Sequence, residues 1–245
     1  MKQEAGKQII IAIVAAVFIF LIAILLPKLI FSNAVAKISA TQILELALSI
    51  LAILILGKGR FAEYGFRLPA PELTQSYRMA RWLTYGIAAL ILGALATVAL
   101  LVTGAAGNPI ARQLTFPQII LFVWIFSSTI EEIFTRGFLQ GHLSRFIETG
   151  RTISLLKVNI PALIGALFFS LMHLSLIASG VDLKTIIILL IFTFSVGLLA
   201  GKLRAETRSL IPAVGVHMLA NIGGVIGGIV FSIISFIVTG KIPVR

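Results

Sequence analysis

Two adjacent carboxylates and an arginine stand in a segment that otherwise has the composition of a lipid-buried helix. The segment is residues 127–137, SSTIEEIFTRG, and it contains Glu131, Glu132 and Arg136. An ionisable group at bilayer depth costs about 2.5–3.5 kcal/mol on insertion scales, so such groups mark a functional site by default. Two later apolar runs each contain one histidine, His173 and His217. We expect the three segments to form one site inside the membrane.

Helical spacing separates the two carboxylates. Residues four apart share a helix face, so Glu132 and Arg136 are expected to form an ion pair. Because removing one partner of a buried pair strands the other charge, we assign this pair a structural role. Glu131 is turned about 100° around the helix from Glu132 and can face a cavity instead. Glu131 is therefore the candidate general base or acid.

The two histidines have polar or aromatic partners at the same spacing. His217 and Asn221 are four apart and can both donate hydrogen bonds, as an oxyanion hole requires; Asn221 orienting His217 is the alternative. Phe169 and His173 are also four apart. A single intramembrane histidine is often a packing residue, but the combination with Glu-Glu…Arg favours a site. We expect the third histidine, His142, at the membrane interface, outside the site.

The elements that must position these residues are membrane-spanning helices. Apolar runs of about 20 residues, the length that crosses a hydrocarbon core, predict an all-α polytopic bundle of about eight spans. The runs are Ile9–Leu26, Thr41–Leu56, Trp82–Val102, Pro117–Leu139, Ile160–Ala178, Leu183–Leu199, Ser209–Ile222 and Gly224–Val238.

The distribution of basic residues tests this number of spans. With the N-terminus in the cytoplasm, both termini and the second, fourth and sixth connections contain 15 Lys and Arg, against 4 in the other connections. Basic residues favour the cytoplasmic side, so the pattern predicts a multi-pass protein with cytoplasmic N- and C-termini. On this topology Glu131, His173 and His217 lie roughly 12–20 Å from the cytoplasmic surface, at 1.5 Å per helical residue.

Composition supports a membrane protein of one domain over residues 1–245. The chain is 59% hydrophobic and 12% charged, with a mean hydropathy of +1.09, whereas a soluble domain is about 25% charged. The net charge of +11 is spread over connections rather than gathered in one patch, which argues against nucleic acid as a partner. The absence of cysteine excludes a thiol nucleophile and thiolate metal ligands.

The motifs together resemble a known family. Glu131-Glu132-x-x-x-Arg136, Phe169-x-x-x-His173 and His217-x-x-x-Asn221, in this order on separate helices, are similar to the motifs of the CPBP family of intramembrane proteases. That family includes the type II CAAX prenyl endopeptidases and bacteriocin-processing or immunity relatives. The resemblance covers about residues 117–238 and implies an intramembrane endopeptidase acting on membrane-associated, in some members prenylated, peptides.

The resemblance also implies a role for each matched residue. Glu131 with His173 would activate the attacking water, and His217 with Asn221 would stabilise the oxyanion. Glu132 and Arg136 would hold the site together. Both metal-independent glutamate proteases and metalloproteases are described in the family. Glu131, His173 and His217 would form an acceptable zinc shell, but the H-E-x-x-H pattern is absent, and we favour the glutamate mechanism without a cofactor.

Two other function classes compete with a protease. Intramembrane Glu, Arg and His also form proton relays in transporters, but the inverted repeat typical of those folds is not evident. A non-catalytic membrane scaffold or immunity protein would keep the fold, and the intact motifs argue against it.

Overall fold

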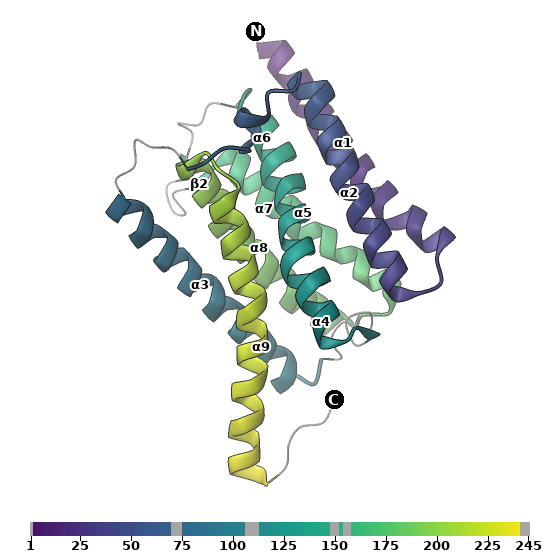
Figure 1. The fold of residues 1–245 in the computed structure, drawn as a ribbon, viewed down its shortest axis with the longest axis vertical. Coiled ribbons are helices and arrows are strands. Elements are labelled where there is room, and N and C mark those ends of the chain that lie inside the picture. Colours follow the sequence, from purple (N-terminus) through teal and green to yellow (C-terminus); the bar gives the residue numbers. More distant parts are fainter. Residues whose placement is uncertain (1, 70–74, 106–112, 148–151, 154–157, 241–245) are drawn as a thin grey trace.

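The computed structural model is a bundle of long helices (Figure 1). It describes residues 2–69, 75–105, 113–147, 152–153 and 158–240. Among these residues, seven helices are long and apolar enough to cross a membrane. Apolar side chains cover the outside of the bundle: Phe18, Ile43 and Ile191 are each 63–65% exposed. This outward apolar surface confirms the predicted helical membrane bundle.

The elements follow the chain order closely. The first half contains α1 (Lys2–Ile30), α2 (Ala34–Gly57), the short η1 (Phe61–Tyr64) and α3 (Gln75–Val102). One continuous helix over residues 116–143 follows, made of α4 (Phe116–Gln118), η3 (Ile119–Ser127), α5 (Ser128–Glu132), η4 (Ile133–Leu139) and α6 (Gln140–Leu143). The second half contains β1 (Thr152–Ile153), β2 (Val158–Asn159), α7 (Ile160–Met172), η5 (His173–Ser179), α8 (Leu183–Thr207) and α9 (Ile211–Thr239).

Polar caps decide where several of the spanning helices begin. The Asn33 side chain accepts hydrogen bonds from the backbone N–H groups at the start of α2. Asn159 does the same for α7, and Asp182 for α8. These caps satisfy N–H groups that have no partner within the helix. They therefore fix the ends of helices whose interiors are almost uniformly apolar.

The expectation of eight spans is corrected to seven. Residues 209–222 and 224–238 were expected as two spans, but they form the single helix α9. Glycine weakens a helix interior, but α9 continues through Gly223-Gly224. In the structure the glycines let α9 approach α3: a Cβ on Gly223 would lie 2.0 Å from the Leu90 carbonyl oxygen, and one on Gly227 would lie 2.5 Å from that of Ala94.

Seven crossings also change the expected topology. In Figure 1, α1 begins and α9 ends at opposite ends of the bundle. Two cytoplasmic termini require an even number of crossings, and the helices that the structure describes are odd in number. Seven crossings would put the two termini on opposite sides of a membrane, and the orientation of the termini stays a prediction. Residues 70–74, 106–112, 148–151, 154–157 and 241–245, which include five of the counted basic residues, lie outside the described part.

Candidate active site

A cavity of about 680 Å³ lies between α2, the 116–143 helix, α7–η5 and α9. Four of the predicted residues, Glu131, His173, His217 and Asn221, line it. The cavity reaches the end of the bundle where α1 meets α2, and there its lining includes Lys28 and Lys37 from those two helices. Residues about 40–90 positions apart in sequence thus share one space, as predicted.

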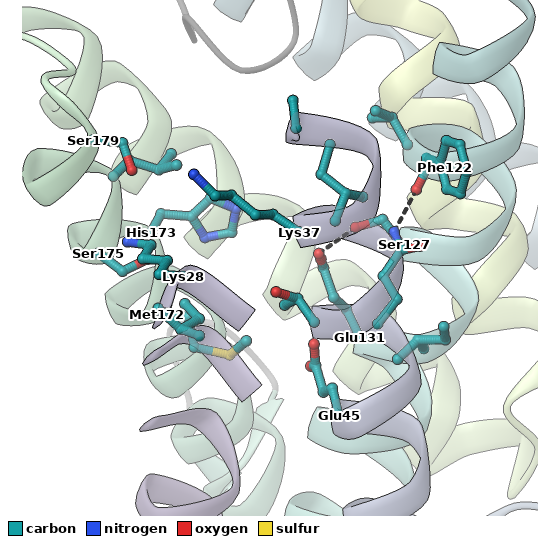
Figure 2. A pocket seen from close by; sticks show the side chains of 18 of the residues that line it. Lys28, Lys37, Glu45, Phe122, Ser127, Glu131, Met172, His173, Ser175 and Ser179 are labelled. Carbon is teal, nitrogen blue, oxygen red and sulfur yellow. Dashed lines mark hydrogen bonds between the residues drawn. The ribbon is translucent and has the colours of Figure 1, made fainter. Parts of the chain in front are cut away.

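Glu131 faces this cavity, whereas Glu132 does not. The Glu131 side chain is 20% exposed and that of Glu132 is 0% exposed. The Ser127 hydroxyl, one turn earlier, donates a hydrogen bond to Glu131 Oε1 (Figure 2). The predicted division between one cavity-facing and one buried carboxylate is therefore present in the structure.

Beneath the cavity, Glu132 is the centre of a buried polar cluster. Its Oε1 lies 3.1 Å from Arg136 Nη1 and 3.0 Å from His217 Nδ1. Arg136 is completely buried and also donates to the Thr135 hydroxyl. Gly197 of α8 makes room for the guanidinium, since a Cβ there would lie 2.9 Å from Nη2. The predicted ion pair is present, with His217 as a third member that the sequence did not indicate.

The Phe169 ring packs against three of the polar groups. Its centroid is 4.6 Å from the Arg136 guanidinium carbon, a cation–π distance. The same ring lies 5.2 Å from the His217 ring and 5.3 Å from the His173 ring, both nearly edge to face. Phe169 therefore separates the two imidazoles and covers the buried arginine.

Hydrogen bonds fix the tautomer of His173. Its Nδ1 lies 2.9 Å from the Phe169 carbonyl oxygen, four residues earlier. A carbonyl can only accept, so Nδ1 carries the proton and, in the neutral ring, Nε2 has the free lone pair. His173 stands at the start of η5, where α7 ends. The imidazole that lines the cavity is thus able to accept a proton from a bound water.

Asn221 and His217 do not bond to one another. The Asn221 amide donates to the Ser128 hydroxyl at 3.0 Å and approaches the Val123 carbonyl oxygen at 3.4 Å. His217 Nε2 lies 3.8 Å from Glu131 Oε2. The alternative in which Asn221 orients His217 directly is therefore wrong. Asn221 instead ties α9 to the 116–143 helix.

The backbone around the carboxylates departs from a regular α-helix. Residues 119–127 and 133–139 are π-helical, and Glu131 and Glu132 lie in the five-residue α-helical stretch between them. π-Helical turns occur often at functional sites. A π-helical turn contains more residues than an α-helical turn, so it changes the angle between successive side chains around the helix. The rule that residues four apart share a face therefore holds for Glu132 and Arg136 only approximately.

Several lining residues were missed or misplaced by sequence reasoning. Glu45 of α2 is 6% exposed, lines the cavity and has a buried Oε1 without a partner among the described residues. Ser127 and Ser128 gave no signal beyond their nearness to the Glu-Glu pair. His142, expected at the membrane interface and outside the site, lies at the end of the 116–143 helix and does not line the cavity; it is completely buried, with Nδ1 2.9 Å from the Tyr64 hydroxyl.

The comparisons with known proteins agree with the motifs. Residues 113–223 match the family described as type II CAAX prenyl endopeptidase Rce1-like. No curated protein and no solved structure matches the chain. The matched segment contains all seven named residues of the three motifs and begins close to the helix that carries Glu131. This match supports the resemblance of residues 113–223 to the CPBP family of intramembrane proteases.

Proposed function

We propose that the chain is an intramembrane endopeptidase in which Glu131 and His173 activate the attacking water. The observation that carries this proposal is that Glu131 and His173 line one cavity while Glu132 and Arg136 are sealed beneath it. A water between the two would meet a carboxylate oriented by Ser127 and the free Nε2 of His173. General-base assistance of this kind contributes about 10²–10⁴-fold to a rate.

In the proposed mechanism, His217 and Asn221 stabilise the tetrahedral oxyanion. His217 Nδ1 faces Glu132, so Nε2 is the ring nitrogen that would donate to the oxyanion. Asn221 has a second amide hydrogen, and the 3.4 Å contact to Val123 is the weaker of its two. If the Asn221 amide gives up its contact with the Val123 carbonyl oxygen, the same amide hydrogen can be donated to the oxyanion, as the second donor of the oxyanion hole.

Zinc does not fit these side chains as they stand. Within the described part of the chain, no three His, Cys, Asp or Glu side chains are placed to hold a metal ion. The proposed mechanism therefore has no step through zinc, and a chelator tests this directly.

The basic residues assign an orientation to the seven-helix fold. Among the described residues, and leaving Arg136 aside, the end of the bundle where α1 begins has 11 Lys and Arg, and the other end has 3. The positive-inside rule then places the N-terminus in the cytoplasm and the C-terminus outside. The cavity reaches the end with fewer basic residues. We therefore expect membrane-associated peptide substrates to enter from the non-cytoplasmic side.

Cysteine labelling tests this orientation cleanly, because the chain has no cysteine of its own. In intact cells, Ser32→Cys at the α1–α2 turn should react with a membrane-impermeant maleimide. Lys58→Cys at the opposite end should react only after the cells are opened. Both side chains are exposed in the structure. The reverse pattern would place the cavity mouth in the cytoplasm and support cytoplasmic, CAAX-type substrates.

Peptide cleavage by the purified chain in detergent tests the activity itself. Lipidated and unlipidated peptides should be compared with wild type and Glu131→Gln, each with and without a zinc chelator. We expect cleavage that Glu131→Gln abolishes and the chelator leaves intact, with Tm unchanged. Glu4→Gln, an exposed carboxylate near the N-terminus, is the matched control. Full activity in Glu131→Gln would exclude this carboxylate as the base, and zinc-restored activity would favour the metalloprotease alternative.

A further inference from the structure

A second cavity, of about 600 Å³, lies at the opposite end of the bundle from the mouth of the candidate active site. It is formed where η1, α6, β2 and the end of α8 meet. Its lining is Ala62, Glu63, Arg67, Gly141, Ser144, Arg145, Asn159, Lys202, Arg204, Ala205, Glu206 and Arg208. None of these residues lines the candidate active site. We call it the basic cavity.

The basic cavity has an excess of positive charge that its own carboxylates do not neutralise. Five lining residues are basic and two are acidic. Glu63 already contacts Arg60 at 3.4 Å and Arg145 at 3.1 Å. Glu206 lies 3.9 Å from Arg81, outside the lining. The other four basic residues form no salt bridge with a described residue; they are Arg67, Lys202, Arg204 and Arg208.

Arg204 shows that the excess charge is built into the fold. It is 93% buried, at 7% exposed, although it lies in the last turn of α8 and lines the cavity. Nη2 donates to the Glu63 carbonyl oxygen at 2.9 Å, but Nε is buried without a partner among the described residues. A buried N–H without an acceptor is unfavourable. An anionic ligand in the cavity would balance the charge of this guanidinium.

The position of the basic cavity indicates a lipid. Lys202, Arg204 and Arg208 lie at the end of a membrane-length helix, so the cavity is at the level of the lipid headgroups. Leu68 and Phe66, which follow η1, are 76% and 36% exposed at the same end. Exposed apolar side chains beside basic ones are typical of a membrane interface. The N-terminal end, where the cavity lies, is also the end richer in basic residues.

We propose that the basic cavity binds the phosphate of an anionic phospholipid headgroup. Guanidinium groups match phosphate oxygens with two parallel hydrogen bonds. Basic pockets between spanning helices on the cytoplasmic side bind acidic headgroups in the same way. Binding at this site does not require peptide cleavage, so its test and that of the proposed activity are separate.

Native mass spectrometry of the full chain in detergent tests the proposal. Short-chain phosphatidylglycerol and phosphatidylcholine with the same acyl chains are added in parallel, and inorganic phosphate forms a third arm. We expect one phosphatidylglycerol to bind, with phosphatidylcholine and inorganic phosphate at least tenfold weaker. Inorganic phosphate binding as tightly as the lipid would overturn the lipid assignment in favour of a soluble phosphate ligand.

Two variants locate the bound lipid. Lys202→Gln and Arg208→Gln remove charge from the rim, and Arg204 is kept because its loss would also remove a buried hydrogen bond. From the usual contribution of one basic residue at a membrane surface, each should weaken phosphatidylglycerol binding about fivefold and the pair about 25-fold. Lys7→Gln, an exposed lysine at the same end outside the cavity, should bind like wild type. Unchanged binding in the double variant with unchanged Tm would refute the proposal.

Discussion

Removing the charge of Arg136 is expected to destabilise the entire bundle. Arg136→Met keeps an unbranched side chain in a completely buried position. It leaves Glu132 charged and 0% exposed, and it removes the 3.1 Å contact between Glu132 Oε1 and Arg136 Nη1. Breaking a buried ion pair in this way costs about 3–5 kcal/mol. A chain of this size loses about 2–4 °C of Tm per kcal/mol, so Tm should fall by about 6–20 °C. Tryptophan fluorescence or circular dichroism in detergent measures the change.

A double variant distinguishes a stranded charge from lost packing. Glu132→Gln/Arg136→Met has neither charge, so it should recover at least half of the Tm that Arg136→Met loses. Arg60→Met is the control, because its pair with Glu63 is 49% and 42% exposed and should contribute only about 0–1 kcal/mol. The structural role of the pair would be refuted if Arg136→Met had the same Tm as wild type. It would also be refuted if the double variant had a lower Tm than Arg136→Met.

Other substitutions test the orientation of the candidate base and the packing of α3 against α9. Ser127→Ala removes the hydrogen bond to Glu131. A bond to a charged group contributes about 1.5–3 kcal/mol, so Tm should fall, and kcat should fall about 10- to 100-fold because Glu131 is no longer held in place. An unaltered kcat would show that Ser127 does not orient the base. Gly223→Ala places a Cβ 2.0 Å from the Leu90 carbonyl oxygen, and such overpacking costs about 1–3 kcal/mol, seen as a lower Tm. Gly228→Ala, whose Cβ has its nearest contact at 3.6 Å, should keep Tm or raise it, and equal effects of the two alanines would contradict the observed α3–α9 contact.

The spacing of residues within one helix was sufficient to predict the local parts of the site. Because neighbours four apart share a face, the sequence predicted the Glu132–Arg136 contact and the separate orientation of Glu131. Long apolar runs predicted the membrane bundle for an equally local reason, since a spanning helix must pair its backbone groups internally. Three motifs in register were also sufficient to indicate the family, without any knowledge of how the helices pack.

Contacts between helices could not be read from spacing. Nothing in the sequence indicated that His217 turns Nδ1 towards Glu132, that Asn221 bonds Ser128 rather than His217, or that Glu45 lines the cavity. The prediction of eight spans was wrong for a related reason. Gly223 weakens a helix locally, yet α9 continues through it and packs closely against α3 there.

The sequence by itself determined the class of protein, the membrane helices and the set of residues able to do chemistry, because each depends on composition or on neighbours within one turn. The tertiary structure decided which carboxylate faces a cavity, which is sealed against Arg136, and at which end of the bundle each cavity lies. It also showed that α1 begins and α9 ends at opposite ends. Those properties depend on how separate helices approach one another, and that is set by side-chain packing and close glycine contacts over the whole bundle.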